Sequence, residues 1–145
     1  QNAFTAGLTY NAHPLGVAAA IACIEEYFRL DVKANVKKLE PVLKRKLAEF
    51  KEKHPSVGDV RSVGLFGAIE FSYSKDHKDV IRKNAAGEPF LGNLIAKLRN
   101  EYGILTMGGG STILVAPPLI ITEQQIDEIF VRLDKAIAEY ADGLV

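Results

Sequence analysis

The stretch of residues 16–24 constrains the fold most, because it is rich in alanine and carries no charged side chain. It follows His13-Pro14, and proline is tolerated in the first turn of a helix, where its missing N–H would have had no partner. We therefore predict a helix over residues 14–29. Apolar side chains occupy every face of its first half, which predicts a long helix buried on all sides between two layers.

Composition excludes several classes of partner. The chain has 145 residues, enough for one domain with a sizeable core, and its 18 basic and 18 acidic side chains give a formal net charge of zero. No basic field exists to attract nucleic acid or an anionic membrane. We expect a cytoplasmic protein, because the longest apolar run is too short to span a bilayer and no signal sequence opens the chain.

The single cysteine, Cys23, lies within the apolar stretch. One thiol makes neither an internal disulfide framework nor a metal site, so Cys23 is predicted to be a small buried residue. The histidines at positions 13, 54 and 77 are scattered without ligand spacing. We expect no metal site, and we expect His54 and His77 to be solvated.

A second helix is predicted over residues 32–53, because its apolar residues recur every three or four positions and bury one face. Pro41 interrupts this pattern, so either the helix kinks there or two helices abut. His54-Pro55 ends it.

The remainder alternates short strands with helices and contains no internal repeat. The predicted strands cover residues 57–63, 65–71, 104–106 and 112–116, and the predicted helices cover 90–101 and the segment after 122. Thr122-Glu-Gln-Gln is a capping-box pattern that opens the last helix. This order predicts an α/β or α+β fold in which helices cover one face of a small sheet.

Three features could carry chemistry. The hydroxyl of Thr9 and the backbone amides around it are donors of the kind that bind a phosphate, although an ordinary N-capped core helix would look the same. Residues 108–110 are three glycines, but no Gly-Lys-Ser/Thr follows and a strand comes next, which favours a hairpin turn over a phosphate loop. Glu70 in an alternating strand is a surface or ion-paired carboxylate rather than a general base.

Three segments carry a family resemblance. Residues 9–15 read Thr-Tyr-Asn-Ala-His-Pro-Leu, residues 60–70 read Val-Arg-Ser-Val-Gly-Leu-Phe-Gly-Ala-Ile-Glu, and residues 117–123 read Pro-Pro-Leu-Ile-Ile-Thr-Glu. In order and spacing they resemble the class III (omega) aminotransferases, pyridoxal-phosphate enzymes of fold type I. Ser62 stands where glycine is usual in that family.

The resemblance implies the C-terminal part of such an enzyme. Residues 1–30 would be the end of the large domain with a linking helix, and residues 31–145 the small domain. The parent, expected to be a homodimer, would move an amino group from an amine or amino acid to a keto acid through pyridoxal phosphate. Thr9 would contact the cofactor phosphate of the neighbouring subunit. The family's cofactor-binding lysine precedes this region, so we expect no catalytic residue here and no activity from the chain alone.

The resemblance also bears on substrate choice. Many relatives carry an arginine in this segment. In some omega-amine enzymes it stands at the position matching Met107, where it pairs with a substrate carboxylate, and in ornithine-type enzymes it stands at the position matching Leu114. This chain has neither arginine. Its parent would bind the carboxylate elsewhere or prefer an amine with little need for that cation. Arg61 could bridge to a carboxylate of the larger domain, or be a plain surface residue.

A second hypothesis is a free-standing α/β interaction module without catalysis. It explains the missing lysine motif without truncation, but leaves the apolar first helix without a covering layer. The chain begins with Gln1 rather than methionine, which suggests a piece of a longer polypeptide, although a processed or trimmed N-terminus would look the same.

Overall fold

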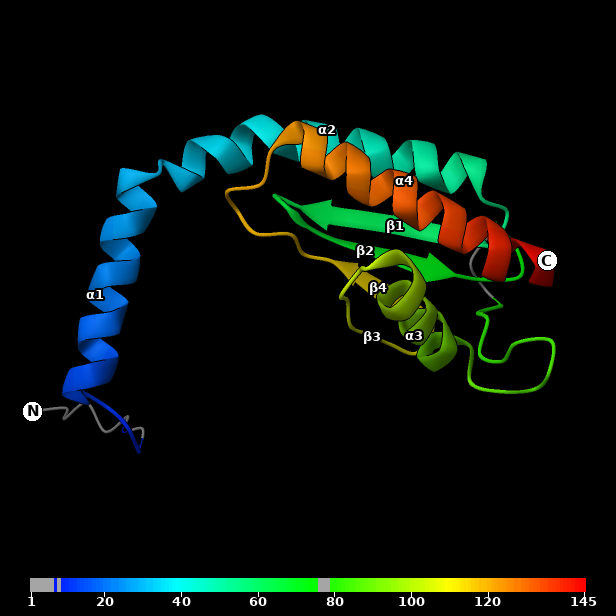
Figure 1. The fold of residues 1–145 in the computed structure, drawn as a ribbon, viewed down its shortest axis with the longest axis horizontal. Coiled ribbons are helices and arrows are strands. Elements are labelled where there is room, and N and C mark those ends of the chain that lie inside the picture. The colour runs from blue at the N-terminus through cyan, green and yellow to red at the C-terminus, as the bar shows by residue number, and fades with distance from the viewer. Residues whose placement is uncertain (1–6, 8, 76–78) are drawn as a thin grey trace, which may run out of the picture. The chain divides into compact units, whose positions relative to one another are not determined.

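The computed structural model describes residue 7, residues 9–75 and residues 79–145. The chain divides into two units, Gln1–Lys33 and Ala34–Val145, and each is described by itself (Figure 1). His77 lies outside the described residues, so the prediction for it stays open.

The first unit contains helix α1, Pro14–Arg29, which begins with its proline in the first turn as predicted. The predicted burial is wrong for this chain, because none of the α1 residues is buried and Phe28 is 82% exposed. Cys23 is likewise exposed. An apolar helix needs neighbours on every side to be buried, and the described part of this unit holds only one helix and a turn.

Helix α2, Val32–Lys53, is one continuous helix that contains Pro41, so of the two alternatives the pair of abutting helices is wrong. Its apolar stripe is buried as predicted, with Leu39, Leu43 and Leu47 each 1% exposed. Near its start, the Asn35 amide donates hydrogen bonds to the carbonyl oxygens of Leu119 and Ile121, at 2.8 and 3.0 Å.

The described residues form a four-stranded antiparallel sheet in the order β1-β2-β4-β3. The strands are β1 Val57–Val63, β2 Phe66–Phe71, β3 Gly108–Gly109 and β4 Thr112–Val115. The predicted strand over 104–106 is wrong, because pairing starts at Gly108. Gly108 pairs with Ile113, so the same register would set residue 104 opposite Pro117, which has no N–H to donate.

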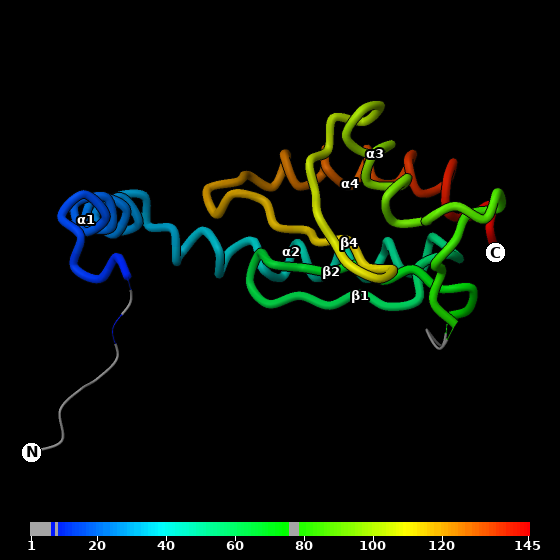
Figure 2. Tube along the Cα trace, turned by 90° about the horizontal axis from the view of Figure 1, so that it is seen from below, coloured from blue at the N-terminus to red at the C-terminus, as the bar shows by residue number. Residues whose placement is uncertain are grey.

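Helices cover one face of this sheet, as predicted for an α+β domain. Helix α3 spans Phe90–Tyr102, helix α4 spans Glu123–Tyr140, and a short 3₁₀ turn, η1, covers Asp142–Leu144. Figures 1 and 2 show α2 and α4 running along the same side of the strands. The predicted capping box is present, since the Thr122 hydroxyl accepts from the Gln125 amide and the Gln125 side chain accepts from Thr122 N–H.

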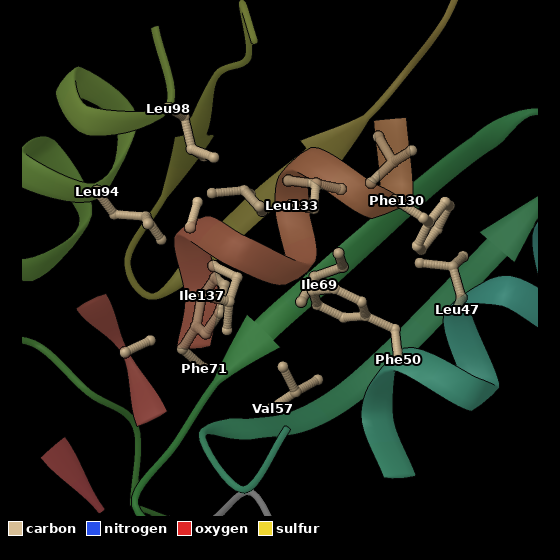
Figure 3. Packing of buried hydrophobic residues seen from close by; sticks show 14 of the residues in the cluster. Leu47, Phe50, Val57, Ile69, Phe71, Leu94, Leu98, Phe130, Leu133 and Ile137 are labelled. Atoms are coloured by element: carbon tan, nitrogen blue, oxygen red, sulfur yellow. The ribbon is translucent and has the colours of Figure 1, made fainter. Parts of the chain in front are cut away.

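The core lies between the sheet and these helices (Figure 3). Alternate residues of the inner strands are buried, among them Ile69 and Phe71 of β2 and Ile113 of β4. The Phe71 ring meets the Phe90 ring edge-on, with centroids 5.3 Å apart. No helix among the described residues is long and apolar enough to cross a membrane.

Candidate functional site

Thr9 lies in an exposed turn that leads into α1. The turn is closed by a hydrogen bond from His13 N–H to the Tyr10 carbonyl oxygen at 3.2 Å, and Ala12 takes a left-handed φ of 57°. Residues 10–13 and the first half of α1 surround a cavity of about 270 Å³, in which Gly16 forms part of the wall.

The surroundings of this turn fit an anionic group. The N-cap residue His13 makes no side-chain capping bond, and the first turn of α1 carries no acidic side chain. A helix N-terminus presents free N–H groups and partial positive charge. The turn therefore offers a hydroxyl and backbone donors with no carboxylate in that first turn to repel a phosphate. Binding of a cofactor by Thr9 stays a prediction.

The three glycines form a hairpin, as predicted, and two of them are required by its geometry. A Cβ on Gly108 would lie 1.9 Å from the Thr112 carbonyl oxygen, and Gly110 has a φ of +64°. Gly110 and Ser111 connect the two strands, and only the first of them has a positive φ, the signature of a type II′ turn. A Cβ added at Gly109 would meet nothing within 4 Å. Met107, just before this turn, is 69% exposed.

Arg61 is paired within its own hairpin. Its guanidinium donates to Glu70 at 2.9 Å and to Asp59 at 2.6 Å. These two hydrogen bonds raise the pKa of Arg61, and the bond to Glu70 has the larger effect. Glu70 is thus an ion-paired carboxylate, as predicted. The hairpin turn is held by Gly64, whose φ is +57° and whose N–H donates to the Glu40 carboxylate at 3.1 Å.

His54 is not solvated, and that prediction is wrong. The side chain is 1% exposed, and Asp134 of α4 and Asp142 of η1, 80 and 88 residues away in sequence, contact its two ring nitrogens. No local pattern indicates partners at that separation. No group of acidic, histidine or cysteine side chains among the described residues could hold a metal ion.

Sequence reasoning also missed a groove of about 680 Å³ in the second unit. It lies between the segment after α3, the exit from β4 and the first half of α4. At one end, Arg132 donates a hydrogen bond to the Tyr102 carbonyl oxygen at 3.2 Å. Three separated segments build the groove, so no single motif marks it. Its walls are residues 103–106, 113–118, 120–122, 125, 128, 129, 132 and 133.

Comparison with known proteins decides the family. A family model described as aminotransferase class-III matches residues 2–137. The chain belongs to the class III aminotransferases. An uncharacterized aminotransferase of Sinorhizobium fredii is 34% identical over 99% of this chain and 30% of its own length. A mitochondrial gamma aminobutyrate transaminase of Solanum lycopersicum is 29% identical over 94% of this chain and 25% of its own length.

Solved structures agree with this aminotransferase fold. The taurine:2-oxoglutarate aminotransferase of Bifidobacterium kashiwanohense, solved with pyridoxal phosphate and glutamate, matches with a TM-score of 0.85 and 35% identity over 97% of this chain and 31% of its own. A pyridoxal-phosphate-bound amine transaminase from an uncultivated Pseudomonas species matches with a TM-score of 0.81 and 28% identity over 94% of this chain and 30% of its own. Class III aminotransferases use pyridoxal phosphate, and this chain spans 25–31% of the length of the relatives named here.

Proposed function

We propose that this aminotransferase chain is the C-terminal part of a cytoplasmic, homodimeric transaminase that moves an amino group from an amine or amino acid to a keto acid. The observation that carries the proposal is the match of 97% of the chain, at a TM-score of 0.85, to 31% of a solved aminotransferase. In this proposal, residues 1–30 end the large domain and residues 31–145 form the small domain. An interaction module is not favoured, since the relatives named above are aminotransferases.

Bound pyridoxal phosphate would supply the electron sink for amino transfer. The contribution proposed for this chain is binding. The Thr9 hydroxyl and the N-terminal amides of α1 would donate hydrogen bonds to the phosphate of the cofactor in the neighbouring subunit. The absence of an acidic side chain from the first turn of α1 supports this role, because a carboxylate there would repel the phosphate.

The proposal is tested by comparing the full-length protein with the 145-residue chain. We expect the full-length protein with pyridoxal phosphate to transfer amino groups to a keto acid, measured by chromatography of the amino-acid product. The 145-residue chain alone should give no turnover, because the proposed cofactor-binding lysine lies outside it. Turnover by the isolated chain, or none by the full-length protein across a broad panel of amines, would contradict the proposal.

Replacing Thr9 with alanine in the full-length protein should weaken cofactor binding roughly ten- to hundredfold. A hydrogen bond to a charged group contributes about 1.5–3 kcal/mol, and about 1.4 kcal/mol corresponds to a tenfold change. Titration of the apo-protein with pyridoxal phosphate measures the affinity. Thr9→Ser, which keeps the hydroxyl, is the matched control and should bind nearly as well as the wild type. Equal affinities for all three proteins would assign Thr9 to a structural role in the turn.

Replacing Met107 with arginine in the full-length protein should raise kcat/KM for 2-oxoglutarate relative to pyruvate. Met107 is exposed before the glycine hairpin, and arginine would offer a planar fork that pairs with a second carboxylate through two hydrogen bonds. Met107→Gln tests the effect of polarity without charge and should leave the ratio unchanged. A flat or lower ratio for the arginine variant would show that this loop does not face the substrate.

A further inference from the structure

A buried polar network ties the end of α2 to the last residues of the chain. His54 Nδ1 lies 2.6 Å from a carboxylate oxygen of Asp142, and Nε2 lies 3.0 Å from a carboxylate oxygen of Asp134. The other oxygen of Asp142 accepts from the Ser56 hydroxyl at 2.6 Å and from the Ser56 N–H at 3.3 Å. One imidazole therefore joins α2, α4 and η1.

The carboxylates of Asp134 and Asp142 determine how many protons the His54 ring must carry. An ionised carboxylate only accepts hydrogen bonds, and a neutral imidazole carries a proton on one nitrogen only. A neutral His54 would therefore set a bare nitrogen lone pair against one of the two carboxylates. In a site where the ring is 1% exposed, water does not relieve that contact, and a buried polar group without its partner is destabilising. Only the imidazolium form satisfies both Asp134 and Asp142.

We propose that His54 is a proton-dependent staple, which in its imidazolium form fastens η1 and α4 to the end of α2 and which loosens when the ring loses one proton. The proposal concerns the second unit alone and does not depend on the activity of the parent enzyme. The staple stabilises the fold while both ring nitrogens carry protons, and this stabilisation is lost as rising pH deprotonates the ring.

The other charged groups around the ring leave this sign unchanged. Lys53 contacts the same Asp134 oxygen at 2.5 Å, and Lys75 donates to the His54 carbonyl oxygen at 2.7 Å. Burial tends to raise the pKa of Asp134, but hydrogen bonds from Lys53 and His54 outweigh it and lower that pKa. Asp134 therefore stays ionised into the acid range, and its own contribution is lost only as pH falls through this lowered pKa. Phe50 covers the ring, with centroids 4.3 Å apart.

The variant Asp134→Asn tests whether the contact between His54 and residue 134 depends on the second proton of the ring. The asparagine amide can donate to an unprotonated Nε2, so a neutral His54 would satisfy both partners in this variant. Asp127→Asn is the matched control, because Asp127 lies on the same helix in a partly exposed pair with Lys46. Urea unfolding of the 145-residue chain is followed at a series of pH values. Nitrogen NMR of the ring, assigned with His54→Gln, reports the protons that it carries.

In the wild type and in Asp127→Asn, we expect the urea midpoint to fall as the pH is raised across the series. In Asp134→Asn that fall should shrink to less than half. Two results would overturn the proposal. One is an equal fall in both variants. The other is a His54 ring that carries only one proton at pH values below those at which the urea midpoint falls. This NMR measurement uses the wild type alone, so it tests the proposal even if Asp134→Asn does not fold.

Discussion

Replacing Phe71 with alanine is expected to lower the free energy of unfolding by about 3–5 kcal/mol, the range for a buried phenylalanine truncated to alanine. Phe71 is 0% exposed at the end of β2 and meets the Phe90 ring edge-on. Truncation removes apolar surface from the core and leaves a cavity between the sheet and α3. Domains of this size are typically stable by only about 5–15 kcal/mol, so the loss is a large fraction of the total stability.

The matched control is Phe66→Ala at the other end of the same strand. Phe66 is 57% exposed, so its truncation should change the free energy of unfolding by less than about 1 kcal/mol. Chemical denaturation monitored by circular dichroism measures both variants. Similar losses for Phe71→Ala and Phe66→Ala would mean that the buried face of the sheet has been assigned to the wrong side.

Replacing Gly108 with alanine should disrupt the β3–β4 hairpin and destabilise the second unit by about 1–3 kcal/mol or more. The new Cβ would lie 1.9 Å from the Thr112 carbonyl oxygen, and a backbone atom of the paired strand cannot rotate away as a flexible side chain would. The strands must separate or shift register to accommodate it.

Gly109→Ala is the control for this prediction, because the added methyl group meets nothing within 4 Å and the backbone is not left-handed. It should be neutral, or stabilise by about 0.4–1 kcal/mol through a less flexible unfolded chain. Hydrogen exchange at the amides of β4 distinguishes the two variants. Fast exchange in both, or in neither, would contradict the steric assignment of Gly108.

Much of the fold follows from local pattern. The spacing of Leu39, Leu43 and Leu47 predicts the buried face of α2 because helical periodicity is a property of neighbouring residues. The Thr122 capping box likewise predicts the start of α4 from four consecutive residues. The alternation of β2 predicts that Ile69 and Phe71 share the buried face.

The features that the sequence did not predict correctly depend on contacts that a local pattern does not contain. His54 lies in a helix-ending His-Pro pair, which predicts exposure, and only folding brings Asp134 and Asp142 to its ring. The apolar run of α1 predicts burial, but burial needs a covering layer that the described part of its unit does not contain. The phosphate donors at Thr9 were predicted from residue type, and the turn in which they lie is consistent with that chemistry.

The long-range contacts of the second unit also set an order for its folding during synthesis. The β1–β2 hairpin is local and can pair as soon as it leaves the ribosome, whereas β4 joins it only after α3 has been made. The Asn35 amide finds the Leu119 carbonyl oxygen 84 residues later, and the Phe50 ring meets that of Phe130 in α4. Pairings of such high sequence separation slow folding. The part of the sheet's apolar face that α4 covers therefore stays exposed until α4 emerges, and transiently exposed apolar surface of this kind makes a folding intermediate prone to aggregation.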